Sequence, residues 1–512
     1  MHKPTRPIRS ILLIAFLAYM LAACRRAAPT SLIEALPTIP NPNRIETIAC
    51  PFVTEAGGAT VTCGKLAVPE DYKNPQGAQI HLLVAIAHST GDNPAKDPVI
   101  VLYADPGMSY AEAARYTVYD PLWAEILKER DLVFYDMRGV GYSEPDTACP
   151  DVAPAQYGNL GGIMSRDERV KAYSEVMLAC RDKLVQSGIR LENYTTAQHV
   201  ADLNAVRTAL EAQKVNLLAL GYGSYLSMRL MQDYPDRIRS ALLSSPYNAQ
   251  ILVYDTAARL QRVLTLVFES CKASESCNAS YPSLEEDFYA TVEKLNRAPA
   301  EISISGYILN SKEFPVIVTG DTFLDMAFDM ASRPTIASLP GLVHNINIDR
   351  TYHLIPRIQD LLGYLGYQNP GMSQTVYCQA YLEEKAKPRP NGQAHKVLRE
   401  WQVFGQQTDE LICSSWFTSK TELSGNPGLS SSVPALVLSG DWNSYVPPDW
   451  VKENVKSFTG VKLVEFPNSG WLFWTGDCIT QLATAFLNDP AAQLNTSCAK
   501  ETPAVIFDLP MK

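Results

Sequence analysis

The stretch with the clearest capacity for chemistry is the turn Gly221–Gly223, which joins an apolar run to a helical repeat. Val215 to Leu220 is long enough for one buried strand of a parallel sheet, and Leu226, Leu230 and Met231 then recur at helical spacing. A sharp turn between a strand and a helix is where many hydrolytic enzymes expose a nucleophile. That chemistry needs a hydroxyl or thiol with a general base beside it, whereas the tip of this turn is glycine.

The segments around this turn carry a family resemblance. Residues 131–143 read DLVFYDMRGVGYS, and residues 63–72 read CGKLAVPEDY. Both resemble secreted tripeptidyl-aminopeptidase-like hydrolases, a branch of the α/β-hydrolases related to proline iminopeptidases. The resemblance covers roughly Cys50 to Pro246 and Pro434 to Cys498. It implies an α/β-hydrolase fold, with a mostly parallel central sheet flanked by helices and a cap inserted over the site. We interpret Asp136 and Arg138 as residues that hold a loop.

The same resemblance places the three positions of a catalytic triad, and each holds an unsuitable residue. The family's N-L-x-G-x-S-x-G-[ST] aligns its serine with Gly221. Its G-x-x-D-x-x-x-P-P aligns the acid with Asn443, and its G-x-G-H aligns the histidine with Trp471. An amide cannot stabilise an imidazolium by charge, and an indole N–H only donates hydrogen bonds. We therefore expect no catalytic residue, and we expect these three positions to converge at the C-terminal edge of the sheet.

The loop that binds the oxyanion in the family is also altered. The family's G-G-P-G-x-S becomes Ala104-Asp105-Pro106-Gly107-Met108-Ser109, and Tyr222 follows the position of the nucleophile. A carboxylate at Asp105 would oppose the negative charge of a tetrahedral intermediate. Glycine at 221 relieves the strain of the turn once no hydroxyl is needed, while Trp471 adds bulk.

The chain divides into five predicted segments. They are a signal peptide (1–23), a tether (24–45), the first part of the hydrolase core (46–246), a largely helical cap (247–432) and the second part of the core (433–512). Helical runs such as Thr256 to Phe268 and Leu284 to Leu295 indicate the cap.

The N-terminus resembles an export signal of a bacterial lipoprotein. Basic residues precede the apolar run Ile11 to Met20, and Leu21-Ala22-Ala23-Cys24 resembles the site at which the cysteine is lipidated. A cleaved signal with an incidental cysteine is the less favoured interpretation, and the apolar run is short for a membrane span. We therefore predict an exported protein, lipid-anchored through Cys24 on the extracytoplasmic face of a bacterial membrane.

Ten of the eleven cysteines remain after Cys24, an even number that suits an oxidising compartment. The residues alone leave their connectivity open. The resemblance implies sequential pairs, which are Cys50 with Cys63, Cys149 with Cys180, Cys271 with Cys277, Cys378 with Cys413, and Cys478 with Cys498. A metal site at Cys271 and Cys277 is disfavoured, because no histidine or third cysteine lies near them.

These observations favour a catalytically inactive hydrolase relative that binds a peptide, a small apolar ligand or a partner protein. Its pocket would be lined by Tyr103, Tyr222, Trp442, Tyr445 and Trp471. No cofactor or metal is expected, and the formal net charge of −10 argues against a nucleic-acid partner. The alternatives are a serine-type hydrolase of the aminopeptidase or esterase kind with non-standard residues, and a purely structural envelope protein.

Replacing Cys24 with serine should abolish membrane attachment. Lipidation at Cys24 is the strong anchor in the predicted lipoprotein signal, so the Cys24→Ser protein should carry no acyl chain and should stay unprocessed or become soluble. Metabolic labelling with a fatty acid and membrane fractionation measure both effects. Membrane retention of the variant without label would contradict the lipoprotein prediction.

Overall fold

The computed structural model describes residues 44–54, 59–103, 105–247, 255–305, 313–367, 369–384, 394–418, 428–471 and 475–510. The predicted signal peptide, Cys24 and most of the tether lie outside these residues. Within them, no helix is both long and apolar enough to span a bilayer.

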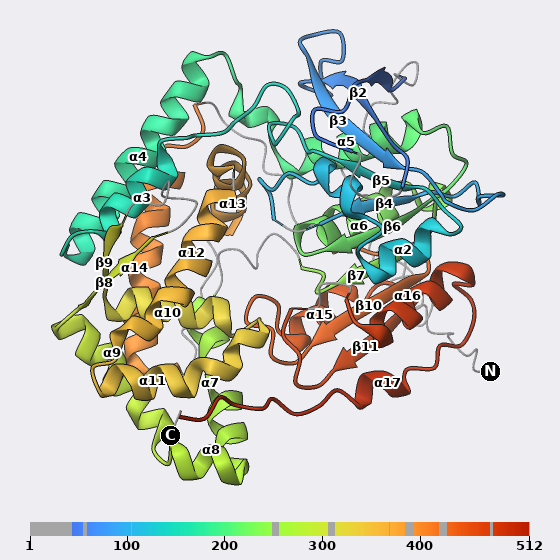
Figure 1. The fold of residues 1–512 in the computed structure, drawn as a ribbon. Helices are drawn as coiled ribbons and strands as arrows, with labels where there is room; N and C mark the ends of the chain where they lie inside the picture. The colour runs from blue at the N-terminus through green and yellow to red at the C-terminus, as the bar shows by residue number, and fades with distance from the viewer. Residues whose placement is uncertain are drawn as a thin grey trace, which may run out of the picture. The chain divides into compact units, whose positions relative to one another are not determined.

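A nine-stranded, mostly parallel sheet forms the core, in the order β1-β2-β3-β5-β4-β6-β7-β10-β11 (Figure 1). The neighbours β5, β4, β6, β7, β10 and β11 run parallel, whereas β1, β2 and β3 pair antiparallel. The strands are β1 (Glu46–Ile48), β2 (Val61–Pro69), β3 (Gln79–Ala87), β4 (Val99–Leu102), β5 (Leu132–Tyr135), β6 (Val215–Leu220), β7 (Ile238–Ser244), β10 (Ala435–Gly440) and β11 (Val461–Phe466). Four of the central strands, β4, β5, β6 and β10, are buried along their whole length, because helices cover both faces.

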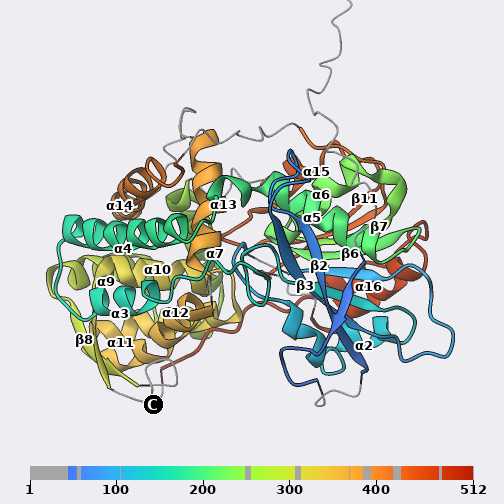
Figure 2. The ribbon, with the colours of Figure 1, turned by 90° about the horizontal axis from the view of Figure 1, so that it is seen from above.

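Helices flank the sheet on its two faces (Figure 2). On one face α2 (Pro121–Leu127) and α16 (Asp477–Asn488) pack against each other over an apolar cluster that includes strand residues. On the other face α5 (Thr196–Ala209) packs against α6 (Tyr222–Asp233). The shorter helices α15 (Pro448–Val455) and α17 (Ser497–Lys500) follow β10 and α16. This architecture confirms the predicted α/β-hydrolase fold.

A second apolar core belongs to a helical cap. The cap contains α7 (Thr256–Ala273), α8 (Glu275–Ser280), α9 (Leu284–Arg297), α10 (Gly320–Met330), α11 (Leu339–Asn347), α12 (Ile355–Tyr367), α13 (Pro370–Glu384), α14 (Lys396–Cys413) and the hairpin of β8 (Ala300–Ile304) with β9 (Phe314–Val318). Two earlier helices, α3 (Val152–Leu160) and α4 (Arg166–Gln186), pack on β9 and α14. The helical layer therefore draws on more of the chain than residues 247–432.

Five disulfides join the pairs named from the resemblance. They are Cys50–Cys63, Cys149–Cys180, Cys271–Cys277, Cys378–Cys413 and Cys478–Cys498. Disulfides persist in oxidising compartments, so they indicate an extracytoplasmic location.

A buried ion pair supports the loop after β5. Arg138 donates two hydrogen bonds of 2.7 Å to the carboxylate of Asp202, and both side chains are at most 1% exposed. The guanidinium also donates to the carbonyl oxygens of Glu70 and Asn193, which ties β2 and the start of α5 to this loop. The expected structural role of Arg138 agrees with these contacts.

Replacing Asp202 with asparagine should lower the free energy of unfolding by about 3–5 kcal/mol, because it leaves the Arg138 charge buried without its counter-ion. Chemical denaturation measures the change. The matched control is Asp349→Asn, which removes an exposed partner of Lys294 and should cost less than about 1 kcal/mol. Equal effects of the two substitutions would contradict this account.

Candidate functional site

The turn after β6 has the geometry of a nucleophile elbow. Gly221 has φ of +58° and ψ of −123°, a region that residues with a side chain rarely adopt. Its N–H donates to the Ser244 carbonyl at the end of β7. Two residues on, a Cβ at Gly223 would lie 2.1 Å from the carbonyl oxygen of Leu102, so only glycine lets α6 start this close to β4.

The indole of Trp471 fills the space above Gly221. A Cβ built on Gly221 would lie 3.1 Å from Cζ2 and 3.4 Å from Cη2 of that ring, and 3.6 Å from Cε1 of Tyr247. The structure therefore brings together Gly221 and Trp471, two of the three positions predicted to correspond to a triad. Aromatic carbon lies in tight contact with the point where a side chain at Gly221 would begin.

Trp471 is positioned by the loop after β11 and by a residue of the cap. The backbone N–H of Trp471 donates to the carbonyl oxygen of Ser332, at 2.8 Å. Its ring meets the ring of Tyr445 edge to face, with centroids 5.2 Å apart. Ser332 follows α10, so the cap fixes where this side chain lies.

Asn443, which is predicted to stand at the position of the triad acid, lies in the loop after β10 and is fully buried. Its Oδ1 accepts from the N–H groups of Tyr445 and Val446, at 2.8 and 2.9 Å, and its Nδ2 donates to Oγ of Ser245 at 3.0 Å. Its link to Trp471 runs through Ser332, whose hydroxyl lies 3.4 Å from Oδ1. These bonds hold the amide of Asn443 against the backbone of its own loop and against Ser245, which follows β7.

The loop after β4 is anchored by Asp136. One oxygen of this carboxylate accepts from Oγ of Ser109 and from the N–H groups of Tyr110 and Ala111, and the other accepts from the N–H of Tyr142. Ala104, the first residue of the predicted oxyanion loop, lies outside the described residues.

Asp105 places negative charge beside the elbow. Burial, followed by the charge of Asp105, raises the pKa of Tyr247 well above its usual value. Burial, followed by the charges of Asp329 and Asp105, also raises the pKa of Tyr445. The carboxylate of Asp105 thus disfavours negative charge on these two hydroxyl groups.

Two residues predicted to line a pocket, Tyr222 and Trp442, are buried in apolar cores, and a third, Tyr103, is half-buried. Tyr222 is fully buried, and its hydroxyl bonds to Thr196 and to Nδ1 of His199, so it belongs to the core behind the elbow. Tyr103 packs against Trp123, with ring centroids 5.5 Å apart.

Trp442 is 3% exposed and belongs to the apolar core of the cap.

Burial and nearby Arg138 lower the pKa of His199, the partner of Tyr222, to about 3, so that imidazole is neutral at physiological pH.

Tyr445 does line a pocket, which has a volume of about 450 Å³ and is otherwise formed by cap residues. Phe328 and Trp401 line it as well, and Phe328 contacts the ring of Tyr445 at a centroid distance of 4.9 Å. Neither of these two residues, nor Ser332 or Tyr247, is predicted from the sequence to lie at the site. Their sequence neighbourhoods carry no motif, so no local signal marks them. In the described part of the chain, no group of three His, Cys, Asp or Glu side chains is arranged to hold a metal ion.

The fold and the elbow define the class of protein, and the family profile of the alpha/beta hydrolase fold matches residues 97–477. The chain belongs to the α/β-hydrolase family.

Among curated relatives, a tripeptidyl aminopeptidase of Streptomyces coelicolor is 32% identical over 37% of this chain and 35% of its own length. Serine protease Hip1 of Mycobacterium tuberculosis is 27% identical over 52% of each chain. The matches thus span about a third to a half of those relatives. A solved proline iminopeptidase of Mycobacterium smegmatis superposes with a TM-score of 0.31 at 14% identity, over 83% of this chain and 94% of that chain.

Replacing Gly221 with alanine should destabilise the protein by about 1–3 kcal/mol, because the methyl group enters a strained backbone region and meets the indole. The control is Gly405→Ala in α14, where a Cβ meets nothing within 4 Å, and this change should stabilise by about 0.5–1 kcal/mol. Equilibrium unfolding measures both.

The Trp471→Ala background separates the two causes. Strain alone would leave the cost of Gly221→Ala unchanged there, whereas a clash with the ring would reduce it. A neutral or stabilising Gly221→Ala substitution would contradict the described geometry.

Proposed function

We propose that this protein is a catalytically inactive α/β-hydrolase relative that binds a ligand, exported and held at a bacterial membrane by lipid on Cys24. One observation carries the loss of catalysis. The ring of Trp471 lies 3.1 Å from the position that a side chain at Gly221 would begin to occupy. A nucleophile placed there would meet indole carbon where it needs a general base.

The electrostatics of the site support the same proposal. Acyl transfer requires donors aimed at the developing oxyanion in a site that favours negative charge. Here the negative charge of Asp105 acts on Tyr247 and Tyr445. The amide of Asn443 is already engaged, because its oxygen accepts from the N–H of Tyr445 and its nitrogen donates to the hydroxyl of Ser245. Restoring one group would leave the others unfavourable.

The binding role rests on the pocket in the cap. Its volume of about 450 Å³ falls within the range of sites for small molecules, and aromatic side chains line much of it. Tyr445 belongs to this pocket and also contacts Trp471, so the pocket lies next to the closed elbow. A peptide or small apolar ligand is the occupant that we expect, and a partner protein is the alternative.

The purified protein should neither react with a fluorophosphonate probe nor turn over a panel of peptide and ester substrates. Gly221→Ser alone, and Gly221→Ser with Trp471→His, should remain within about 10³-fold of uncatalysed hydrolysis, because triad members act as a unit. Active-site labelling and initial rates provide the measurement.

A working serine hydrolase would give a different result. Turnover by the unchanged protein that disappears on mutation of one named residue would support the hydrolase alternative and overturn the proposal. Brisk ester hydrolysis by the Gly221→Ser protein would show that a base lies within reach of the elbow.

A further inference from the structure

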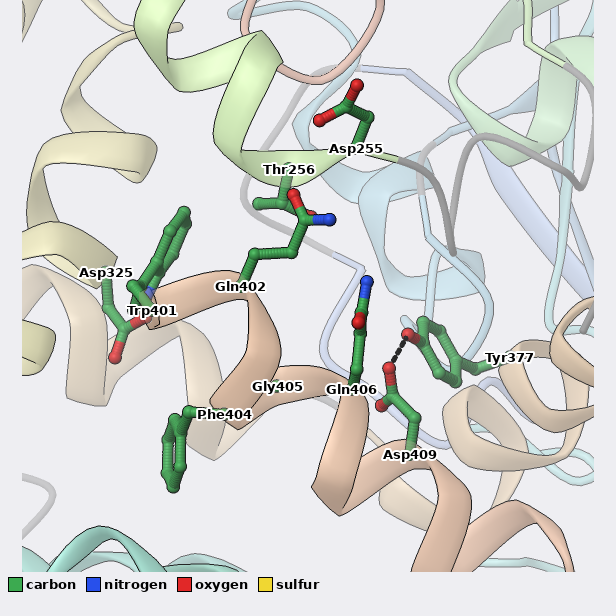
Figure 3. Close-up of a pocket in the computed structure, with 10 residues that line it drawn as sticks. All are labelled: Asp255, Thr256, Asp325, Tyr377, Trp401, Gln402, Phe404, Gly405, Gln406 and Asp409. Atoms are coloured by element: carbon green, nitrogen blue, oxygen red, sulfur yellow. Dashed lines mark hydrogen bonds between the residues drawn. The ribbon is translucent and has the colours of Figure 1, made fainter. Parts of the chain in front are cut away.

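Two neighbouring pockets in the cap share one wall. The larger is the pocket of about 450 Å³ described above, and the smaller has a volume of about 200 Å³. Five residues line both pockets, and Figure 3 shows them around the smaller one. They are Asp325, Trp401, Phe404, Gly405 and Asp409.

The shared wall is a face of α14. Residues at helical spacing from Trp401 to Asp409 point toward the pockets, because positions three or four apart lie on the same side of a helix. Gly405 stands in the middle of this wall, and a Cβ built on it meets no atom within 4 Å (Figure 3). The absence of a side chain there leaves room for a ligand to pass along the wall.

Carboxylates are distributed along both pockets. Asp255 lines the smaller, Asp325 and Asp409 line both, and Asp329 lines the larger. Asp325 is open to the pockets and accepts from Nε1 of Trp401 at 2.9 Å. Asp325 keeps an exposed surface, yet the protein around the pocket partly desolvates its carboxylate and raises its pKa above the usual value. A cationic group of a ligand would restore its preference for the charged form.

The arginine that lines the larger pocket does not cancel this charge. Arg169 donates to the carboxylate of Asp321 at 2.6 Å, and its guanidinium lies 4.8 Å from the centre of the Phe404 ring. Asp409 accepts from the hydroxyl of Tyr377 at 2.7 Å (Figure 3), and Asp329 pairs with Arg333. The lining is therefore more acidic than basic, which disfavours an anionic ligand.

Aromatic and aliphatic side chains line the larger pocket together with these carboxylates. The larger pocket is lined by Leu160, Tyr173, Phe328, Leu361, Trp401, Phe404 and Tyr445. Such surfaces bind methylene chains, and aromatic faces also attract cations. A lining that combines carboxylates with apolar side chains suits an unbranched ligand whose charges are separated by methylene groups.

We propose that the two pockets form one binding site for a linear aliphatic polyamine, with an ammonium group at Asp325, methylene segments against Trp401 and Phe404, and the chain passing Gly405. This inference rests on the proposed ligand-binding function and names the class of ligand. A neutral apolar ligand would bring no counter-charge to Asp325, and a bulky ligand would not extend into the smaller pocket.

Calorimetry with spermidine at 150 mM salt tests the proposal. The full protein should bind one equivalent with saturable heat, and 1,8-octanediol, which has methylenes but no charge, should bind at least tenfold more weakly. Asp325→Asn keeps the hydrogen-bond acceptor for Trp401 and removes the charge. Gly405→Leu places a side chain in the space along α14 through which the ligand would pass, without a clash in the unliganded protein. Each should weaken spermidine binding at least tenfold.

Two matched variants control for general charge and for a larger side chain in a helix. Asp287→Asn removes an exposed carboxylate in the first turn of α9, and Gly158→Leu adds a side chain in α3 where a Cβ meets nothing within 4 Å. Both should change the affinity less than twofold, and thermal unfolding of all four variants confirms that each is folded.

Several outcomes would overturn the inference. They are no saturable binding by the unchanged protein, equal affinity for the diol, or undiminished binding by the Asp325→Asn or Gly405→Leu protein. Hydrolytic activity is measured separately, so turnover with intact spermidine binding would overturn only the loss of catalysis. No turnover and no spermidine binding would overturn only the choice of ligand.

Discussion

The packing of the Trp471 indole on the backbone of Gly221 is the constraint on which the rest of the site depends. The elbow keeps the positive φ that presents a nucleophile in hydrolases, yet the ring occupies the space that the elbow would serve. The cap holds that ring in place, because the backbone N–H of Trp471 donates to the carbonyl of Ser332. The hydroxyl of Ser332 also lies 2.6 Å from that of Ser444 in the loop after β10. One serine thus connects the cap with two loops of the sheet edge.

The cap and the sheet edge are joined in other ways. Arg262 of α7 donates to the carbonyls of Asp441 and Asn443, and Arg259 donates to that of Tyr445. The loop that would present the triad acid is therefore held by its backbone, in the shape that brings Tyr445 to the pocket. In addition, α10 carries Asp325 and the pocket residue Phe328, and it ends two residues before Ser332. The helix that lines the pocket also positions the residue that closes the elbow.

Much of the fold could be predicted because strands and motifs are local in sequence. The apolar run Val215 to Leu220 is β6 without change, and Thr256 to Phe268 lies within α7. The register of the motifs around Gly221 and Trp471 also predicted that these two residues converge, and the structure places them in contact. The direction of a side chain was harder to predict. Tyr222 follows the elbow as the first residue of α6, but its side chain is buried against His199.

The pocket depends on contacts that no local pattern reports. Asp325 meets Trp401 across 76 residues of sequence, and the two lie on different helices. The packing of α3 and α4 on the cap is likewise a long-range contact. The composition of α3 and α4 does not distinguish them from the part of the hydrolase core that precedes them in the chain. Tertiary packing, which the sequence pattern does not encode locally, decided both.

The disulfide Cys378–Cys413 joins α13 to α14 within the wall of the pockets. Tyr377 lies beside the first cysteine, and its bond to Asp409 is one helical turn before the second. A covalent link there limits how far the two helices can separate, and so keeps the pocket formed before any ligand arrives. Its reduction would free α13 and α14 to move apart. Under the proposed ligand-binding function, retention of the ligand would depend on whether this disulfide is formed, which an oxidising compartment favours.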